Sequence, residues 1–193
     1  MRIGLFGGTF DPVHLGHLRA AENAREALAL DRVLLVPSAV PPHRGAPATP
    51  AADRLEMTRL AAATHPAFEA SDVELRRTGP SYTVDTVCAV LEERPGDTLV
   101  LLVGADTWPE MTSWREPERL FSLVEVGVAE RPGSPLEPLR PPFPSSRPVH
   151  HVSGPSLPIS ATAVRARVAA GQSVRYLVPD AVLHYIEARR LYS

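Results

Sequence analysis

The sequence is poor in cysteine, in excess charge and in long apolar runs, and each shortage excludes a class of protein. Cys88 is its only cysteine, so the chain cannot form an internal disulfide and suits a reducing compartment. Basic and acidic residues nearly balance, at 20 against 22, so no overall positive field attracts nucleic acid or an anionic membrane. We therefore expect any anionic ligand to be held by a local site.

The apolar stretches are too short for a signal peptide or a membrane span. The first is interrupted at Gly7, Gly8 and Pro12, and no other approaches the roughly 20 residues of a membrane-spanning helix. A chain of 193 residues, 44% of them hydrophobic, can build one sizeable core. We expect a cytoplasmic protein in which residues 1–193 form a single domain, with a C-terminal helical part from about residue 160.

Alternating apolar runs and helical patterns predict the fold class. Strands are expected at residues 2–6, 33–36, 69–75, 98–103, 124–129 and 149–152. Helices are expected at residues 15–30, 51–64, 81–93, 116–123, 160–170 and from Pro179 to Leu191. Proline-rich loops fill 37–50 and 131–148. Strand, helix and strand in succession form the βαβ unit, so we predict an α/β fold, a single Rossmann-like open parallel sheet with helices on both faces.

The junction after the first expected strand carries the clearest chemistry. It reads Gly7-Gly8-Thr9-Phe10-Asp11-Pro12-Val13-His14-Leu15-Gly16-His17. Glycines let a phosphate approach the backbone, and the following helix offers N–H groups and its positive dipole end. His14 and His17, three residues apart, share one helix face and can both donate to phosphate oxygens. Two alternative interpretations of these histidines remain. They could be two ligands of a metal ion, although no third ligand lies nearby in the sequence, or they could be ordinary surface residues.

The whole string resembles the GTFDPxHxGH signature of the adenylyl- and cytidylyltransferase superfamily, which includes nicotinate mononucleotide and phosphopantetheine adenylyltransferases. The resemblance implies direct displacement at the α-phosphorus of a nucleoside triphosphate, with release of pyrophosphate and no protein nucleophile. It also implies that His14 and His17 are catalytic, because they would bind the triphosphate and stabilise the charge that builds on it. Mg²⁺ would bridge the substrate phosphates, without a dedicated protein metal site.

Further strings resemble bacterial nicotinate-nucleotide adenylyltransferases along most of the chain. They are Pro37–Arg44, Arg54 with Met57, Gly79–Thr86, Gly104–Asp106 with Trp114, Arg131–Gly133, Ile159–Arg165 and Tyr176–Pro179. The strings at Gly79–Thr86 and Gly104–Trp114 favour this group over phosphopantetheine adenylyltransferases. Two positions depart from its pattern: Arg44 replaces a lysine, which changes the phosphate contact in detail, and Ala161 replaces a serine, which removes one hydroxyl.

The resemblance implies a substrate site assembled from several segments. ATP and its phosphates are expected at Gly7, Gly8, Thr9, Phe10, Arg44, Gly104, Asp106, Ser160 and Arg165. Nicotinate mononucleotide is expected at Ser81, Tyr82, Thr83, Trp114 and Arg131. From the residues alone, Trp114 could stack on a cationic pyridine ring or fill the core. Asp106 and Ser160 could be helix caps, and Arg165 a solvated side chain.

The expected function is an adenylyltransferase that joins ATP and nicotinate mononucleotide to give nicotinate adenine dinucleotide and pyrophosphate, a step of NAD biosynthesis. Its partners would be these small molecules, without nucleic acid or membrane. A related adenylyltransferase with another phosphate acceptor, such as phosphopantetheine, is the first alternative. A catalytically silent nucleotide sensor on the same fold is the second. The sequence leaves the oligomeric state open, a homo-oligomer included.

Overall fold

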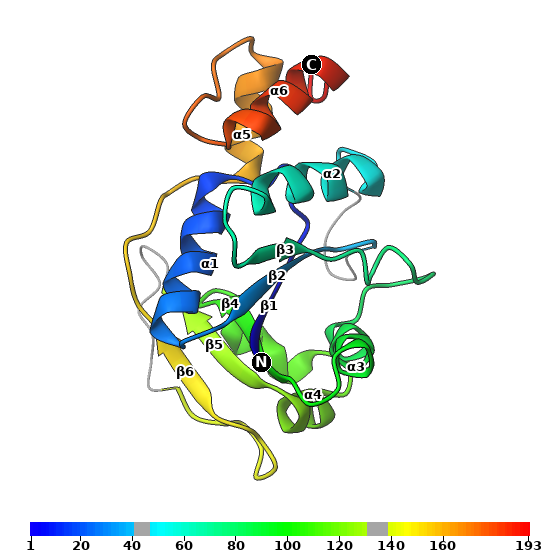
Figure 1. Cartoon of the computed structure of the whole chain (residues 1–193), viewed down its shortest axis with the longest axis vertical. Coiled ribbons are helices and arrows are strands. Elements are labelled where there is room, and N and C mark those ends of the chain that lie inside the picture. The colour runs from blue at the N-terminus through cyan, green and yellow to red at the C-terminus, as the bar shows by residue number, and fades with distance from the viewer. Residues whose placement is uncertain (41–46, 131–138) are drawn as a thin grey trace.

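The computed structural model describes residues 1–40, 47–130 and 139–193, and its strands and helices alternate along the chain (Figure 1). The strands are β1 (Arg2–Gly8), β2 (Arg32–Pro37), β3 (Phe68–Ala70), β4 (Thr98–Gly104), β5 (Glu125–Ala129) and β6 (Val149–Val152). The helices are α1 (Leu15–Ala27), α2 (Ala51–Ala62), α3 (Thr83–Glu93), the 3₁₀ helix η1 (Trp108–Ser113), α4 (Pro117–Leu123), α5 (Ala161–Ala169) and α6 (Asp180–Arg189). No helix in these ranges is long and apolar enough to cross a membrane.

The six strands form one parallel sheet in the order β3-β2-β1-β4-β5-β6. The predicted α/β fold class, with a Rossmann-like open sheet, is therefore confirmed. The strand order reverses between β1 and β4, since β1 leads outward through β2 and β4 leads outward through β5. In such sheets, ligands bind outside the carboxyl ends of the strands at the reversal point. The fold thus directs attention to the loops that follow β1 and β4.

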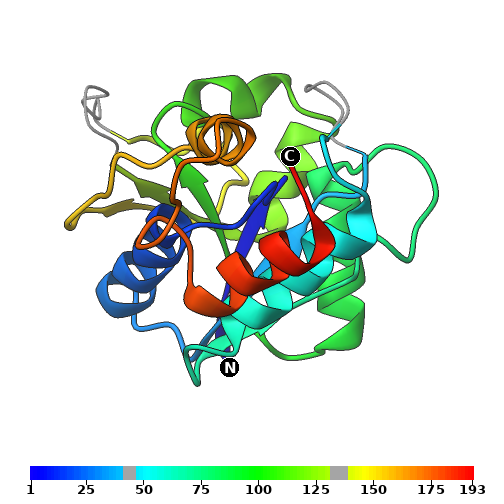
Figure 2. The same ribbon diagram turned by 90° about the horizontal axis from the view of Figure 1, so that it is seen from above.

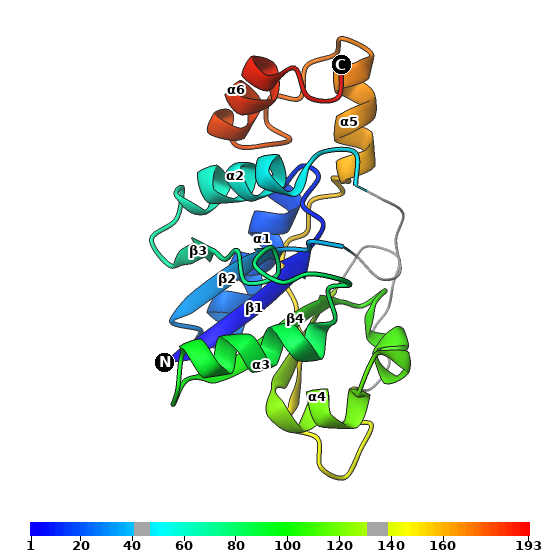
Figure 3. The same cartoon turned by 90° about the vertical axis from the view of Figure 1, so that its right-hand side faces the viewer.

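Two apolar layers cover the two faces of the sheet. In β2, Val33 and Leu35 pack with the buried residues of α1 and α2, whereas Leu34 and Val36 pack with those of α3 and α4. Strands buried on both faces read as continuous apolar runs, as this one does. Figure 3 shows α3 and α4 on one side of the sheet and α1 and α2 on the other. Helices α5 and α6 lie beyond α2, on the side away from α3 and α4.

Helix α6 lies along α2 when the molecule is seen from above (Figure 2). A hydrogen bond ties the two helices together, because the hydroxyl of Tyr185 donates to Oδ1 of Asp53 over 2.8 Å. Val182 and Ile186 on α6 are buried in the same apolar layer as Met57 on α2. The last helix is thus packed onto the body of the sheet and brings the segment after it close to the loops of the N-terminal half.

Several predicted boundaries were wrong. The strand predicted at 69–75 ends at Ala70, because the chain turns and the N–H of Arg76 donates to the carbonyl of Asp72 over 3.1 Å. The last helix ends at Arg189 and not at Leu191, since Arg190 adopts a left-handed conformation with φ 51°. Pro179 is its N-cap and not its first helical residue.

The predicted loop at 131–148 is only partly described, and its second half is anchored. Leu139 and Phe143 pack against the apolar layer of α3 and α4. The Phe143 ring meets the Phe121 ring with centroids 5.8 Å apart, and the N–H of Arg147 donates to the Phe121 carbonyl over 2.8 Å. Buried aromatic contacts therefore hold residues 139–148 to α4, although their sequence shows no periodicity.

An ion pair at the amino ends of β1 and β5 makes stability depend on pH. Arg2 donates two hydrogen bonds to Glu125, at 3.0 and 2.7 Å, and these lower the pKa of the Glu125 carboxyl. A lowered pKa means that the stabilisation is present above the unfolded value of about 4.3 and is lost as pH falls through the lower folded value. We expect Glu125→Gln to unfold at lower urea concentration than the parent protein at pH 7, with the gap closing below about pH 4. An equal gap at pH 7 and pH 3 would contradict this.

Candidate active site

The hydrogen-bonded ladder between β1 and β4 ends before the two strands do. Its last pair is Leu5 with Leu101, although β1 runs to Gly8 and β4 to Gly104. Beyond that pair, β1 stays paired with β2, and β4 stays paired with β5. The two central strands therefore part at their carboxyl ends, between the loops that follow them. A doubly wound sheet takes a nucleotide at this place.

His14 and His17 start helix α1 and are locked to each other. His14 is the N-cap, and its Nδ1 accepts the backbone N–H of His17 at 3.3 Å. Nδ1 of His17 accepts the backbone N–H of His14 at 3.2 Å. The rings stack with centroids 3.6 Å apart and an interplanar angle of 18°. A ring nitrogen that accepts an N–H carries no proton, so both imidazoles are neutral and hold their proton on Nε2.

The two histidines combine with the helix that they start. Their Nε2–H groups are hydrogen-bond donors, and the first turn of α1 adds the positive end of the helix dipole. Donors of this kind at a helix N-terminus form a binding place for phosphate. The structure therefore brings His14 and His17 together at the edge of the sheet where the fold places a ligand.

Phe10 supports His17 from the core. Its backbone is left-handed, with φ 48°, and its side chain is 2% exposed. Its ring meets the His17 ring edge to face at 5.0 Å, and the Phe6 ring at 5.9 Å. These contacts fix the orientation of the imidazole. A contact between Phe10 and ATP would therefore involve its backbone, because its ring is turned inward.

The glycines of this junction serve different purposes. Among the described residues, a Cβ at Gly7 would meet no neighbouring atom within 4 Å, so the backbone there offers room for a ligand. A Cβ at Gly8 would lie 2.9 Å from the Phe10 ring. A Cβ at Gly16 would lie 3.0 Å from Nδ1 of His14 and 3.2 Å from the carbonyl oxygen of Leu157. Gly16 therefore makes room for the His14 ring, where the sequence suggested room for a ligand.

Asp11 is buried, and its carboxylate accepts three hydrogen bonds from two segments of the chain. The donors are the N–H of Ala48 at 2.6 Å, the hydroxyl of Thr49 at 2.5 Å and the hydroxyl of Tyr192 at 2.7 Å. The residue is 3% exposed, and a buried carboxylate needs such donors. The sequence placed Asp11 inside the motif without giving it a role. A charged residue next to apolar neighbours was the available signal, but its partners are too distant in sequence to be inferred.

Arg54 is a second buried charge that sequence reasoning left without a role. It is 1% exposed and donates to the carbonyls of Thr9 at 2.8 Å, Thr49 at 3.3 Å and Ala39 at 3.4 Å. Burial lowers the pKa of its guanidinium, and the nearby Asp11 charge opposes that shift. One side chain on α2 thus holds the loops after β1 and β2 and the turn before α2 in fixed relative positions.

Helix α5 contributes Ser160 and Arg165 at the same edge of the sheet. The Ser160 hydroxyl accepts the N–H of Ala163 at 3.1 Å and so caps the helix. Arg165 donates from Nη1 to the carbonyl of Asp11 over 2.7 Å and from Nη2 to the Thr162 hydroxyl over 3.3 Å. Ser160 therefore acts as the cap that one interpretation predicted, while Arg165 reaches the histidine-bearing junction and is not merely a solvated side chain.

The loop after β4 lies on the other side of the crevice. Gly104 ends the strand, and Asp106 is exposed in the turn that follows. Thr107, and not Asp106, occupies the N-cap position of η1. Trp108 is partly buried and packs edge to face at 5.8 Å on Phe121, which belongs to the core. Trp114 is half-buried at the end of η1 and packs against the same layer.

The start of α3 faces the loop after β2. Tyr82 is the N-cap, its own side chain does not cap the helix, and Thr83 is the first helical residue. The Ser81 hydroxyl accepts the N–H groups of Ala39 at 3.0 Å and Val40 at 3.3 Å. The helix predicted from Ser81 therefore begins two residues later, because Ser81 is engaged with the neighbouring loop.

Arg115 is a residue of this region that sequence reasoning missed. Its guanidinium lies 4.7 Å above the centre of the Tyr82 ring and pairs with Asp85 at 3.5 Å. It follows Trp114 directly, so this contact brings the end of η1 to the start of α3. Basic character next to the tryptophan was the only signal in the sequence.

Two predicted site residues, Arg44 for phosphate and Arg131 for nicotinate mononucleotide, lie outside the described residues. Within the part that is described, histidine, cysteine, aspartate and glutamate do not gather into any group of three or more able to hold a metal ion. The remaining predicted site residues lie at the end of β1 or β4, in the segments that follow these strands, or at the start or in the first half of α3 or α5.

Comparison with known proteins agrees with this geometry. The model of the cytidylyltransferase-like family matches residues 5–167. A probable nicotinate-nucleotide adenylyltransferase of Thermus thermophilus is 49% identical over 192 residues, with 100% of both chains covered. A protein of the same description from Exiguobacterium sibiricum is 42% identical over 193 residues, again with 100% of both covered.

A solved structure shows the same fold at low sequence identity. Plasmodium falciparum nicotinic acid mononucleotide adenylyltransferase, complexed with NaAD, superposes with a TM-score of 0.80 at 18% identity, covering 99% of this chain and 97% of its own. The resemblance predicted from the motifs is thus confirmed by full-length relatives. The chain belongs to the cytidylyltransferase-like family and, within it, to the group of the nicotinate-nucleotide adenylyltransferases.

Proposed function

We propose that this chain transfers the adenylyl group of MgATP to the phosphate of nicotinate mononucleotide, giving nicotinate adenine dinucleotide and pyrophosphate. A phosphate oxygen of the mononucleotide attacks the α-phosphorus and forms the new P–O bond. The bond from the α-phosphorus to the oxygen shared with the β-phosphorus breaks, and pyrophosphate leaves with that electron pair. No protein nucleophile takes part.

The stacked pair of neutral histidines at the β1–α1 junction carries this proposal. Phosphoryl transfer needs positioning and stabilisation of negative charge more than covalent chemistry from the protein. Two Nε2–H donors, fixed through Nδ1 at the start of a helix, can supply that stabilisation without reorganising during the reaction. We assign His14 and His17 to the α-phosphate and the departing pyrophosphate.

The other assignments follow from the edge of the sheet. ATP would lie along Gly7, Gly8, the backbone of Thr9 and Phe10, Gly104, Asp106, Ser160 and Arg165, with Arg44 as a further phosphate contact. Nicotinate mononucleotide would lie along Ser81, Tyr82, Thr83 and Trp114, with Arg131 near its phosphate. Mg²⁺ enters with the triphosphate, as part of the substrate.

The start of α3 is expected to favour the acid form of the mononucleotide over the amide. The first N–H groups of a helix lack intrahelical partners, and the side chain of the N-cap residue Tyr82 does not cap them here. A carboxylate accepts charge-assisted hydrogen bonds from these N–H groups. The NH₂ of an amide is itself a donor, so it cannot accept from them and disfavours binding. We expect kcat/KM to be at least about tenfold higher for nicotinate mononucleotide than for nicotinamide mononucleotide.

Trp114→Phe should raise the KM of both mononucleotides while keeping their ratio, because the two rings stack alike on an aromatic face. Trp108→Phe is the matched control, since Trp108 packs on Phe121 in the core, and we expect it to leave both constants near those of the parent protein. A loss of selectivity in Trp114→Phe, or equal kcat/KM for the two substrates in the parent protein, would contradict the carboxylate site at α3.

A panel of acceptors tests the proposed reaction. Purified protein, MgATP and one acceptor at a time are incubated, pyrophosphate is measured, and the product is identified by mass. Nicotinate mononucleotide should give nicotinate adenine dinucleotide with the highest kcat/KM. Faster turnover of 4′-phosphopantetheine would favour the related adenylyltransferase, and no turnover with any acceptor would favour the silent sensor.

We further propose the setting of the reaction. Residues 1–193 act as one nucleotidylyltransferase domain, supported by the packing of α6 on α2. The single cysteine fits a cytoplasmic enzyme. Its partners are the two small-molecule substrates, without nucleic acid or membrane. A homo-oligomer is compatible with all of these assignments, which need only one chain.

A further inference from the structure

We propose that Tyr192 is a positioning residue for catalysis, which acts through Asp11 on the histidine-bearing junction. This inference rests on the proposed function for its kinetic readout. Tyr192 lies after α6, and it reaches back across almost the whole chain to the motif that begins the site.

The contact is partly buried and directional. The Tyr192 hydroxyl donates to Oδ1 of Asp11 over 2.7 Å, beside the Thr49 hydroxyl, which donates to the same oxygen over 2.5 Å. Burial raises the pKa of Tyr192 well above its ordinary value, and the bond to Asp11 adds to that shift. The phenol therefore stays protonated and keeps donating, and its removal leaves a buried carboxylate oxygen with one donor fewer.

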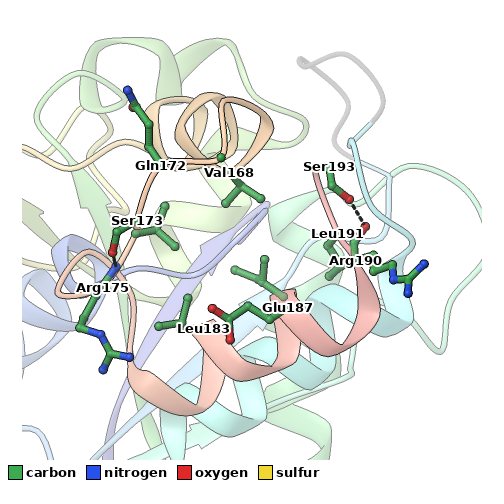
Figure 4. Close-up of a pocket in the computed structure, with 12 residues that line it drawn as sticks. Val168, Gln172, Ser173, Arg175, Leu183, Glu187, Arg190, Leu191 and Ser193 are labelled. Carbon is green, nitrogen blue, oxygen red and sulfur yellow. Dashed lines mark hydrogen bonds between the residues drawn. The ribbon is translucent and has the colours of Figure 1, made fainter.

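The backbone after α6 adopts an unusual conformation that places the Tyr192 hydroxyl at Asp11. Arg190 and Tyr192 both adopt left-handed conformations, with φ of 51° and 65°, which cost energy in residues other than glycine. Leu191 and Ser193, on either side of Tyr192, line a hollow between α5 and α6 (Figure 4). Tyr192 is turned the other way, to Asp11. Within this segment, Tyr192 contacts the junction, whereas Arg190, Leu191 and Ser193 line the hollow.

The position of Asp11 determines the positions of the proposed catalytic histidines. Asp11 lies three residues before His14, and the Arg165 guanidinium holds its backbone carbonyl at 2.7 Å. The Asp11 carboxylate and carbonyl are therefore held by three separate segments of the chain, which contribute residues 48–49, Arg165 and Tyr192. A shift of this turn moves the N-cap of α1, and with it both imidazoles, and misplacement on the scale of an ångström can slow an enzyme about a hundredfold.

The chain offers a matched pair of variants. Tyr192→Phe and Tyr185→Phe each remove one tyrosine hydroxyl that donates to an aspartate, but Tyr185 is bonded to Asp53 on α2, away from the junction. We expect Tyr192→Phe to lower kcat about tenfold with a smaller change in the KM of the mononucleotide. Tyr185→Phe should leave kcat unchanged while costing similar stability in urea unfolding. Equal kcat in the two variants would overturn the proposal.

A double-mutant cycle tests whether the effect passes through Asp11. In an Asp11→Ala background, the further change Tyr192→Phe should alter kcat less than twofold, because alanine offers no acceptor for the Tyr192 hydroxyl. A full tenfold loss in that background would overturn the proposed route.

Titration with ATP alone, measured by calorimetry, needs no acceptor substrate. Weaker ATP binding by Tyr192→Phe than by Tyr185→Phe would support the positioning role even if nicotinate mononucleotide were not the substrate, and equal binding would count against it.

Discussion

Replacing His17 by glutamine is expected to lower kcat at least about a hundredfold while leaving the fold intact. His17 has one role in the structure and a second in the proposed mechanism, because its Nδ1 accepts the N–H of the N-cap and its Nε2–H would donate to phosphate. Glutamine at this third helical position can still accept the N-cap N–H, as in a capping box, but it does not provide the imidazole N–H. The KM for ATP should rise much less than kcat falls, since the charge to be stabilised develops in the transition state.

The comparison with His17→Ala separates the two roles. Alanine removes both the donor and the cap, so it should lose the same activity and in addition about 1 kcal/mol of stability. His14→Asn, which keeps a capping side chain, should also lose activity, with a larger defect in ATP binding. His184→Gln, on the exposed face of α6, is the control and should match the parent protein. Near-parental turnover in folded His17→Gln would remove His17 from the mechanism.

Replacing Arg54 by alanine is expected to cost the largest stability of any single change considered, about 3 kcal/mol in the free energy of unfolding. The guanidinium is fully buried and donates to carbonyls of three loops. Its removal leaves those carbonyl oxygens without their hydrogen-bond donor and opens a cavity. It also takes away the positive charge near the buried Asp11 carboxylate. Urea unfolding followed by circular dichroism measures the difference.

Two variants in the same helix sharpen this test. Arg59→Ala removes an arginine that is 54% exposed and pairs with Glu56 at 3.8 Å, and such surface pairs contribute less than about 1 kcal/mol. Arg54→Lys keeps the charge but not the planar fork, so its stability should lie between those of Arg54→Ala and the parent protein. If Arg54→Ala unfolded at the same urea concentration as Arg59→Ala, the buried guanidinium would not hold the loops together.

Much of the fold could be predicted from the sequence because its signals are local. The run at 98–103 is apolar throughout, which indicates a strand covered on both faces, and β4 alternates its side chains between the two apolar layers. Boundaries were harder to predict where a distant contact competes with local propensity. Ser81 could have capped α3, but its hydroxyl accepts N–H groups from the loop after β2.

The residues of the candidate site likewise fall into those that a local sequence pattern predicts and those that depend on contacts between distant segments. His14, His17 and the glycines share one short string, so their proximity and helix-start position could be read directly. The partners of Asp11 are contributed by Thr49 and Tyr192, which no local pattern connects to it. The inward turn of Phe10 and the contact of Arg115 with Tyr82 likewise depend on packing between segments. Sequence reasoning found the groups proposed to touch substrate and missed those that hold them in place.

The fate of the α-phosphate of ATP tests the central claim most directly. ATP labelled at the α-phosphorus is incubated with the parent protein, Mg²⁺ and nicotinate mononucleotide, and the products are separated. We expect the label to appear in nicotinate adenine dinucleotide in a one-to-one ratio with pyrophosphate, with none left on the protein after denaturation. Label that remained in ATP, was released as AMP or stayed attached to the protein would contradict direct adenylyl transfer at this site.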